Sequence, residues 1–127
     1  MAKWARSGVL DNGLNDIKNN ATVMMLISAY SAGDSYATVV ANNLAEASMT
    51  GTDFTLGSSG SNRTLTTAAG KSATATASAS GTPDLHIAFT DGSANVIWVT
   101  DETTNQPITS GNVINFPQLV YTSNQPT

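Results

Sequence analysis

Cysteine is absent from the 127 residues of this chain, and histidine occurs once, as His86. Without cysteine, neither a disulfide nor a thiolate metal site can stabilise the fold. A single histidine also excludes a metal site with two histidine ligands within one chain. A serine nucleophile would need a base beside it, and His86 lies in no Gly-x-Ser-x-Gly context. We therefore expect neither a cofactor nor enzymatic activity.

Charged residues are also scarce, at 11% of the chain against the roughly 25% usual for soluble proteins. Nine acidic residues outnumber five basic ones, which gives a formal net charge of −4. The basic residues are scattered singly along the chain, at Lys3, Arg6, Lys18, Arg63 and Lys71. They form no basic patch that could neutralise phosphates, so direct nucleic-acid binding is not expected.

The acidic residues lie mostly at predicted turns and strand ends, where carboxylates are usually solvated or capping. Residues 91–95 and 100–102 could offer oxygen ligands to calcium, but neither segment matches a twelve-residue EF-hand loop. A Gly-x-x-x-x-Gly-Lys-Ser/Thr motif for phosphate binding is absent as well. We interpret the acids as turn residues and predict no catalytic, cofactor-binding or metal-binding residues.

Long apolar runs are missing too. No stretch approaches 18 apolar residues, and the basic N-terminal segment is not followed by an apolar run of 7–15 residues. We expect neither a signal peptide nor contact with a membrane, and we expect synthesis in the cytoplasm. The length and the 40% hydrophobic content suit one domain with one core, here residues 7–127, preceded by an arm at residues 1–6.

The first elements of the domain follow from hydrophobic spacing. Residues 7–20 are predicted to form a helix, because apolar side chains recur at helical spacing, at Val9, Leu10, Leu14 and Ile17. Residues 23–29 form a continuous apolar run, which predicts a central strand covered on both faces. Residues 30–47 remain ambiguous between a helix and a segment that contains a strand.

The rest of the chain is predicted to be β. Strands are expected at residues 54–56, 63–68, 72–79, 85–90, 96–100, 112–116 and 119–121. Turn residues at 57–62 predict a loop, and those at 69–71 and 91–95 predict hairpins between the strands that flank them. About seven short strands at such spacing favour a mainly β fold, a β-sandwich or small β-barrel with a short N-terminal helix.

Two segments are candidate contact surfaces. Trp4 and Arg6 lie on the N-terminal arm, outside the predicted helix, where a tryptophan could bind a neighbouring subunit as an aromatic hot spot. Residues 72–79 alternate alanine with serine or threonine, which predicts a flat strand face of small residues, with Ala73, Ala75 and Ala77 as candidate contacts. A surface rich in hydroxyl and amide groups suits large contacts with other proteins.

An aromatic sugar-binding platform is an alternative, because aromatic faces stack on pyranose rings. Its members would be Trp4, Tyr30, Tyr36, Trp98 and Tyr121. Their scatter along the chain favours core and interface roles instead.

Several segments spread over nearly the full chain carry a resemblance to a known family. They are residues 4–6 and 9–22, Leu26-Ile27-Ser28-Ala29, Asp53-Phe54-Thr55-Leu56-Gly57, Ser80-Gly81-Thr82, Leu85-His86-Ile87-Ala88 and residues 119–127. In these segments the chain resembles a family of small structural proteins of tailed bacteriophage virions, often of the capsid decoration or cement type.

The resemblance implies a structural protein of the virion head surface that stabilises the capsid, with no catalytic residues. The expected partners are the major capsid protein and further copies of the chain, as a trimer on three-fold positions of the shell. A tail, neck or fibre component and a carbohydrate- or receptor-binding module are the alternatives.

Overall fold

The computed structural model describes residues 2–102 and 104–127, which are 37% strand and 18% helix. The prediction of a mainly β fold with one N-terminal helix is therefore confirmed. In chain order, the elements are α1 (Ser7–Asn20), β1 (Val23–Ile27), α2 (Tyr36–Ala41), β2 (Asn43–Ser48), η1 (Gly51–Asp53), β3 (Phe54–Ser59), β4 (Asn62–Thr67), β5 (Ser72–Thr74), β6 (His86–Thr90), β7 (Val96–Asp101), β8 (Val113–Asn115) and β9 (Val120–Ser123).

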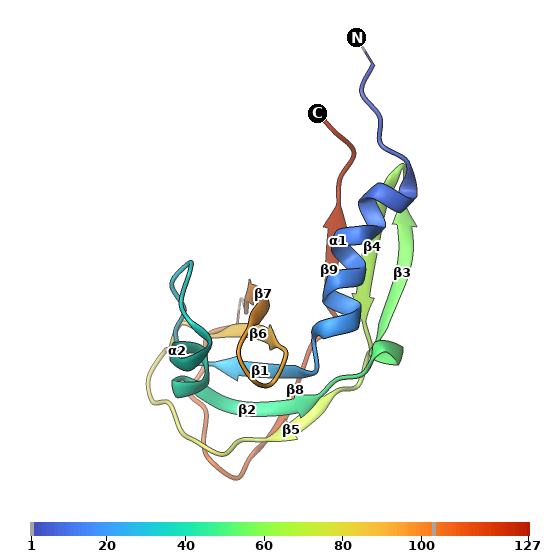
Figure 1. Cartoon of the computed structure of the whole chain (residues 1–127). Coiled ribbons are helices and arrows are strands. Elements are labelled where there is room, and N and C mark those ends of the chain that lie inside the picture. Colours follow the sequence, from blue (N-terminus) through green and yellow to red (C-terminus); the bar gives the residue numbers. More distant parts are fainter. Residues whose placement is uncertain (1, 103) are drawn as a thin grey trace.

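The strands form three antiparallel sheets, with the orders β2-β1-β6-β7, β3-β4-β9 and β5-β8. Helix α1 lies along the β3-β4-β9 sheet, while β1, β2, β5 and β8 lie at the opposite end of the molecule from the two termini (Figure 1). Among the described strands no closed barrel is formed. The two ends of the molecule are thus built from different sheets.

Helix α1 spans the predicted residues 7–20. It buries Leu10, Leu14 and Ile17, which follow one another at four- and three-residue steps and so share one face. Val9 was expected on this face, but it is 57% exposed. The reason is geometric, since Val9 precedes Leu10 by one residue and points about 100° away around the helix.

Strand β1 lies between β2 and β6, so the prediction of a central strand is confirmed. Its side chains alternate between two apolar clusters. Met24 and Leu26 face the main core, which also contains Leu14 of α1. Met25 and Ile27 face a smaller cluster. Its other members are Val39 of α2 and Ala88 of β6, with Val23, Tyr30, Val96 and Val99 packed against them.

The ambiguous segment 30–47 contains both of its alternatives in succession. Helix α2 begins after Ser35, whose Oγ accepts a hydrogen bond from the backbone N–H of Thr38 at 3.2 Å. The chain then turns into β2, which pairs with β1. A local pattern could not separate these possibilities, because a six-residue helix depends on packing of Val39 against β1 and β6.

The predicted hairpin at residues 69–71 is wrong. Strand β4 pairs with β3 and β9, and β5 pairs with β8, so residues 69–71 lead from one sheet to another. The strand predicted at residues 72–79 is also too long. Only residues 72–74 form a strand, β5, and beyond it Ala79 makes an isolated β-bridge to Ile108. Alternation identifies an extended segment but carries no information about its distant partner.

The predicted loop at residues 57–62 is shorter than expected. Strands β3 and β4 pair as far as Ser59 and Asn62, and only a tight turn remains between them. Gly60 occupies this turn with a φ of 62°, a left-handed conformation that glycine adopts without steric cost. The predicted hairpin at residues 91–95 is confirmed, since it joins the paired strands β6 and β7.

Candidate functional site

The N-terminal arm is tied to the C-terminal segment, and the two termini lie at the same end of the molecule (Figure 1). The backbone N–H of Ala5 donates to Oε1 of Gln125 at 2.8 Å, and Nε2 of Gln125 donates to the Ala5 carbonyl at 2.9 Å. Nζ of Lys3 donates to the Thr127 carbonyl at 2.6 Å. The arm therefore has a defined attachment at Ala5. Met1, part of the predicted arm, lies outside the described residues.

Trp4 is 74% exposed, although it is one of the largest apolar side chains of the protein. Arg6 is exposed as well. An indole that stays in water keeps most of its apolar surface available for a partner, and buried tryptophans dominate many interfaces. The structure thus places both predicted arm contacts where a second molecule can reach them.

The alanine side chains of residues 72–79 were predicted to face a partner, but in the structure they face the core. Ala75 is 2% exposed and belongs to the main core, while Ala73 and Ala77 are partly buried against it. The side chains left exposed are the intervening hydroxyls, on Ser72, Thr74, Thr76 and Ser78. Because alanine is the more apolar member of each pair, its side faces the core. Ala75 is therefore not available to a partner, and the accessible side of this segment is hydroxylated.

The five aromatic residues do not form one platform. Trp98 stacks on Phe89 with ring centroids 4.7 Å apart, and Tyr121 meets it edge-on at 5.3 Å. Tyr30 instead lies against the His86 ring at 5.8 Å. Tyr121 is 41% exposed and lines a hollow of about 280 Å³ together with Asp16 and Ser123.

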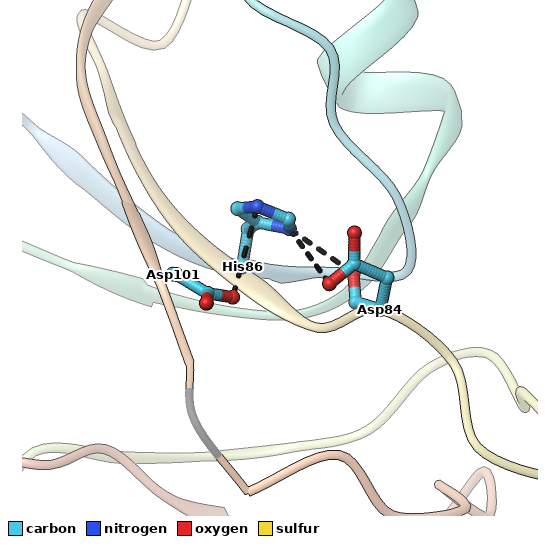
Figure 2. A group of neighbouring side chains, drawn as sticks. All are labelled: Asp84, His86 and Asp101. Atoms are coloured by element: carbon cyan, nitrogen blue, oxygen red, sulfur yellow. Dashed lines mark hydrogen bonds and ion pairs between the residues drawn. The ribbon is translucent and has the colours of Figure 1, made fainter.

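His86 lies between two carboxylates (Figure 2). Its Nδ1 is 3.0 Å from the backbone oxygen of Asp84 and 4.0 Å from the carboxylate of the same residue. Its Nε2 is 3.8 Å from a carboxylate oxygen of Asp101. The ring is mostly buried, as expected of a lone histidine that forms hydrogen bonds within a strand.

Among the described residues, Asp84, His86 and Asp101 lie close enough together to offer ligand atoms to one metal ion. The two carboxylates approach different nitrogens of the ring, however, and both are mostly exposed. A zinc site takes one nitrogen from each histidine and needs four ligands. The three residues therefore do not present the converging ligand set of a zinc centre.

Asp91, considered above as a calcium ligand, is committed to its own turn. Oδ1 accepts hydrogen bonds from the backbone N–H groups of Ser93, Ala94 and Asn95 at 2.9 to 3.0 Å. Nδ2 of Asn95 donates to Oδ2 at 2.7 Å. These hydrogen bonds, those from Ala94 and Asn95 foremost, hold the pKa of Asp91 well below its ordinary value. The interpretation of residues 91–95 as a turn is confirmed.

Sequence reasoning missed an apolar cavity of about 390 Å³ near the end of the molecule opposite the termini. Its lining residues come from β1, β6, β8 and the segments that flank them, and are Leu26, Leu85, Ile87, Glu102, Thr104, Gln106, Ile108, Ile114, Asn115, Phe116 and Pro117. The available signal was Ile108, an isolated apolar residue next to Pro107 that belonged to no predicted strand. Its role depends on folding back onto the sheet, where it bridges to Ala79.

Comparisons with known proteins found no family model, no curated protein and no solved structure that matches this chain. Within the described residues, no helix combines the length and the apolar character needed to cross a membrane.

Proposed function

We propose that this protein is a virion structural protein that binds the assembled capsid surface of a tailed bacteriophage and stabilises it, as a decoration or cement protein. The observation that carries the proposal is the arm. It presents Trp4 to solvent, while two hydrogen bonds between the Ala5 backbone and the Gln125 side chain hold the arm in place. An exposed aromatic residue on an anchored segment can bury its apolar area on a partner at a small cost in conformational entropy.

The rest of the surface supports contacts of the same kind. Large apolar side chains are exposed at separate places, on the arm, both helices and two strands, namely Trp4, Val9, Val40, Val113, Val120 and Tyr121. Only 11% of the chain is charged, so few charges would have to be desolvated in a broad contact. A cement protein binds several coat subunits at once, and symmetry repeats each weak contact around the shell.

The test is co-sedimentation of the purified protein with expanded, undecorated phage heads, followed by cryo-electron microscopy of the pellet. We expect ordered density at symmetric sites on the shell, with the arm at a contact. Trp4→Ala should weaken binding by more than about tenfold, as hot-spot truncations do. Val113→Ala is the matched control, since it also shortens an exposed apolar side chain but lies on β8.

Absence of binding to the heads would contradict the decoration role and favour a tail, neck or fibre component. Equal losses for Trp4→Ala and Val113→Ala would show that the arm has no special part in the contact.

One observation favours the carbohydrate-binding alternative, namely the hollow beside Tyr121. An exposed ring next to the Asp16 carboxylate and the Ser123 hydroxyl has the composition of a small sugar site. Glycan-array binding by the purified protein that is lost in Asp16→Ala would support this function, and no binding above background would exclude it for the glycans on the array.

A further inference from the structure

The cavity opposite the termini has the properties of a pocket for a single large apolar side chain. Leu85, Ile87 and Phe116 in its wall are buried, while Thr104 and Gln106 are exposed beside it. Its volume of about 390 Å³ lies in the range of roughly 300–1,000 Å³ that is typical of ligand pockets. Interface hot spots are aromatic side chains that fill such pockets.

Trp4 cannot reach this cavity within its own chain. The arm is anchored at Ala5 by the two hydrogen bonds to Gln125, so Trp4 lies only one residue beyond a fixed point. That point precedes α1, whose 14 residues span about 21 Å before the chain reaches β1. The arm therefore leaves the molecule at one end, and β1, β6 and β8, which line the cavity, lie towards the other (Figure 1).

The charges of the arm and of the cavity are complementary. Arg6, two residues from Trp4, carries a positive charge and is exposed, whereas Nζ of Lys3 is engaged by the main-chain oxygen of Thr127. Glu102 lines the cavity and carries a negative charge, while the neighbouring Asp101 pairs with His86 and is not part of the lining. Opposite charges around an apolar contact orient two molecules and disfavour other pairings.

We propose that Trp4 of one copy of this chain binds in the apolar cavity of a second copy, with Arg6 facing Glu102. The contact joins two different surfaces, so it is heterologous, and it repeats from copy to copy as a closed ring or an open filament, depending on the rotation between copies. In this arrangement Trp4 is buried between copies, so Trp4→Ala weakens binding to heads through the loss of self-association. The contact concerns copies of the chain alone, so its own test requires no capsid.

The absence of cysteine permits a direct test by crosslinking in the full-length protein. Ala2→Cys places a thiol near Trp4, and Gln106→Cys places one at the cavity. An equimolar mixture of the two single variants, treated with a short thiol-specific crosslinker, should give a mixed dimer. Thr55→Cys, exposed on β3 away from the cavity, replaces Gln106→Cys as the matched control and should give little product.

Adding Trp4→Ala to the Ala2→Cys variant should reduce the mixed dimer more than about tenfold. Failure to form this dimer, or equal yields with Gln106→Cys and Thr55→Cys, would overturn the proposal, whether or not the protein decorates capsids. A crosslink that survives Trp4→Ala would likewise overturn the proposal, since the indole is the proposed anchor of the contact.

Charge reversal provides a second measurement, by sedimentation velocity of the full chain. Glu102→Lys should weaken self-association about two- to fivefold, and Arg6→Glu should do the same. The double variant should recover much of the loss, because the two reversed charges attract again. Glu46→Lys, exposed on β2, is the control for net charge. If the losses of self-association add in the double variant, Arg6 and Glu102 do not lie opposite each other in the contact.

Discussion

Three backbone N–H groups in the β6–β7 loop converge on one oxygen of Asp91. A carboxylate is a stronger acceptor than a protonated carboxyl group, so the turn favours the ionised form. Such side-chain capping occurs elsewhere as well. Oδ2 of Asp53 accepts from the backbone N–H of Thr50 at 2.8 Å and from Nζ of Lys71 at 3.3 Å, which lowers the pKa of Asp53. Single acids thus shape individual turns of this protein.

Asp91 should contribute a pH-dependent part of the stability. Its folded pKa lies below the ordinary value of 3.8, so its contribution is fully present above pH 3.8 and is lost as the pH falls through the folded pKa. Asp91→Asn should therefore be less stable than the wild type near neutral pH, and the gap should narrow in acid. Urea unfolding at a series of pH values measures this difference in the free energy of unfolding. Glu46→Gln, an exposed carboxylate on β2, is the control, and a gap that does not change with pH would contradict the prediction.

Polar contacts and apolar packing together dock α1 on the β3-β4-β9 sheet. Nε of Arg63 on β4 donates to Oδ1 of Asp11 at 2.8 Å. Nζ of Lys18 donates to the carbonyls of Gly51 and Phe54, both at 2.7 Å. Partly exposed ion pairs contribute at most about 1 kcal/mol each, so the buried apolar face of the helix contributes more.

Leu14→Ala should lower the free energy of unfolding by about 2–5 kcal/mol, because Leu14 is 1% exposed in the main core and its truncation leaves a cavity. Val9→Ala removes an exposed apolar side chain from the same helix and should change the free energy of unfolding by less than about 0.5 kcal/mol. Chemical denaturation of both variants gives the comparison. Similar losses would mean that the helix docks differently.

On the scale of the whole molecule, the N-terminal arm lies outside the cores, whereas the cavity is lined by core residues such as Leu85, Ile87 and Phe116. The cores are built by the helices, the three sheets and the segments between them, while the arm contributes its hydrogen bonds to Gln125 and Thr127. The arm and the apolar cavity lie at opposite ends, a placement suited to assemblies in which each copy contacts its neighbours.

Deletion of residues 1–6 should leave the fold nearly as stable as before, since it removes a few solvent-accessible hydrogen bonds and, among the described residues 2–6, no core side chain. We expect the melting temperature to fall by less than about 5 °C. Binding to heads and self-association should both weaken strongly. Calorimetry and co-sedimentation on the same preparation measure the two effects, and parallel losses would mean that the arm is part of the core.

Local patterns predicted the elements that depend on near neighbours. The spacing of Leu10, Leu14 and Ile17 is enough to define α1, because helical periodicity is a property of adjacent turns. The hairpin around Asp91 follows from turn chemistry over five residues. Trp4 and Arg6 were predicted to lie on an arm outside the helix, and α1 does begin after them, at Ser7.

The sequence by itself determined the mainly β character, the bounds of α1, the central position of β1 and the place of Trp4 and Arg6 outside the helix. Only the tertiary structure decided that β5 pairs with β8, that Ala75 faces the core, and that Ile108 lines a cavity. Periodicity states that a strand has two faces, but the partner and the buried face are chosen by long-range packing, which no local segment encodes.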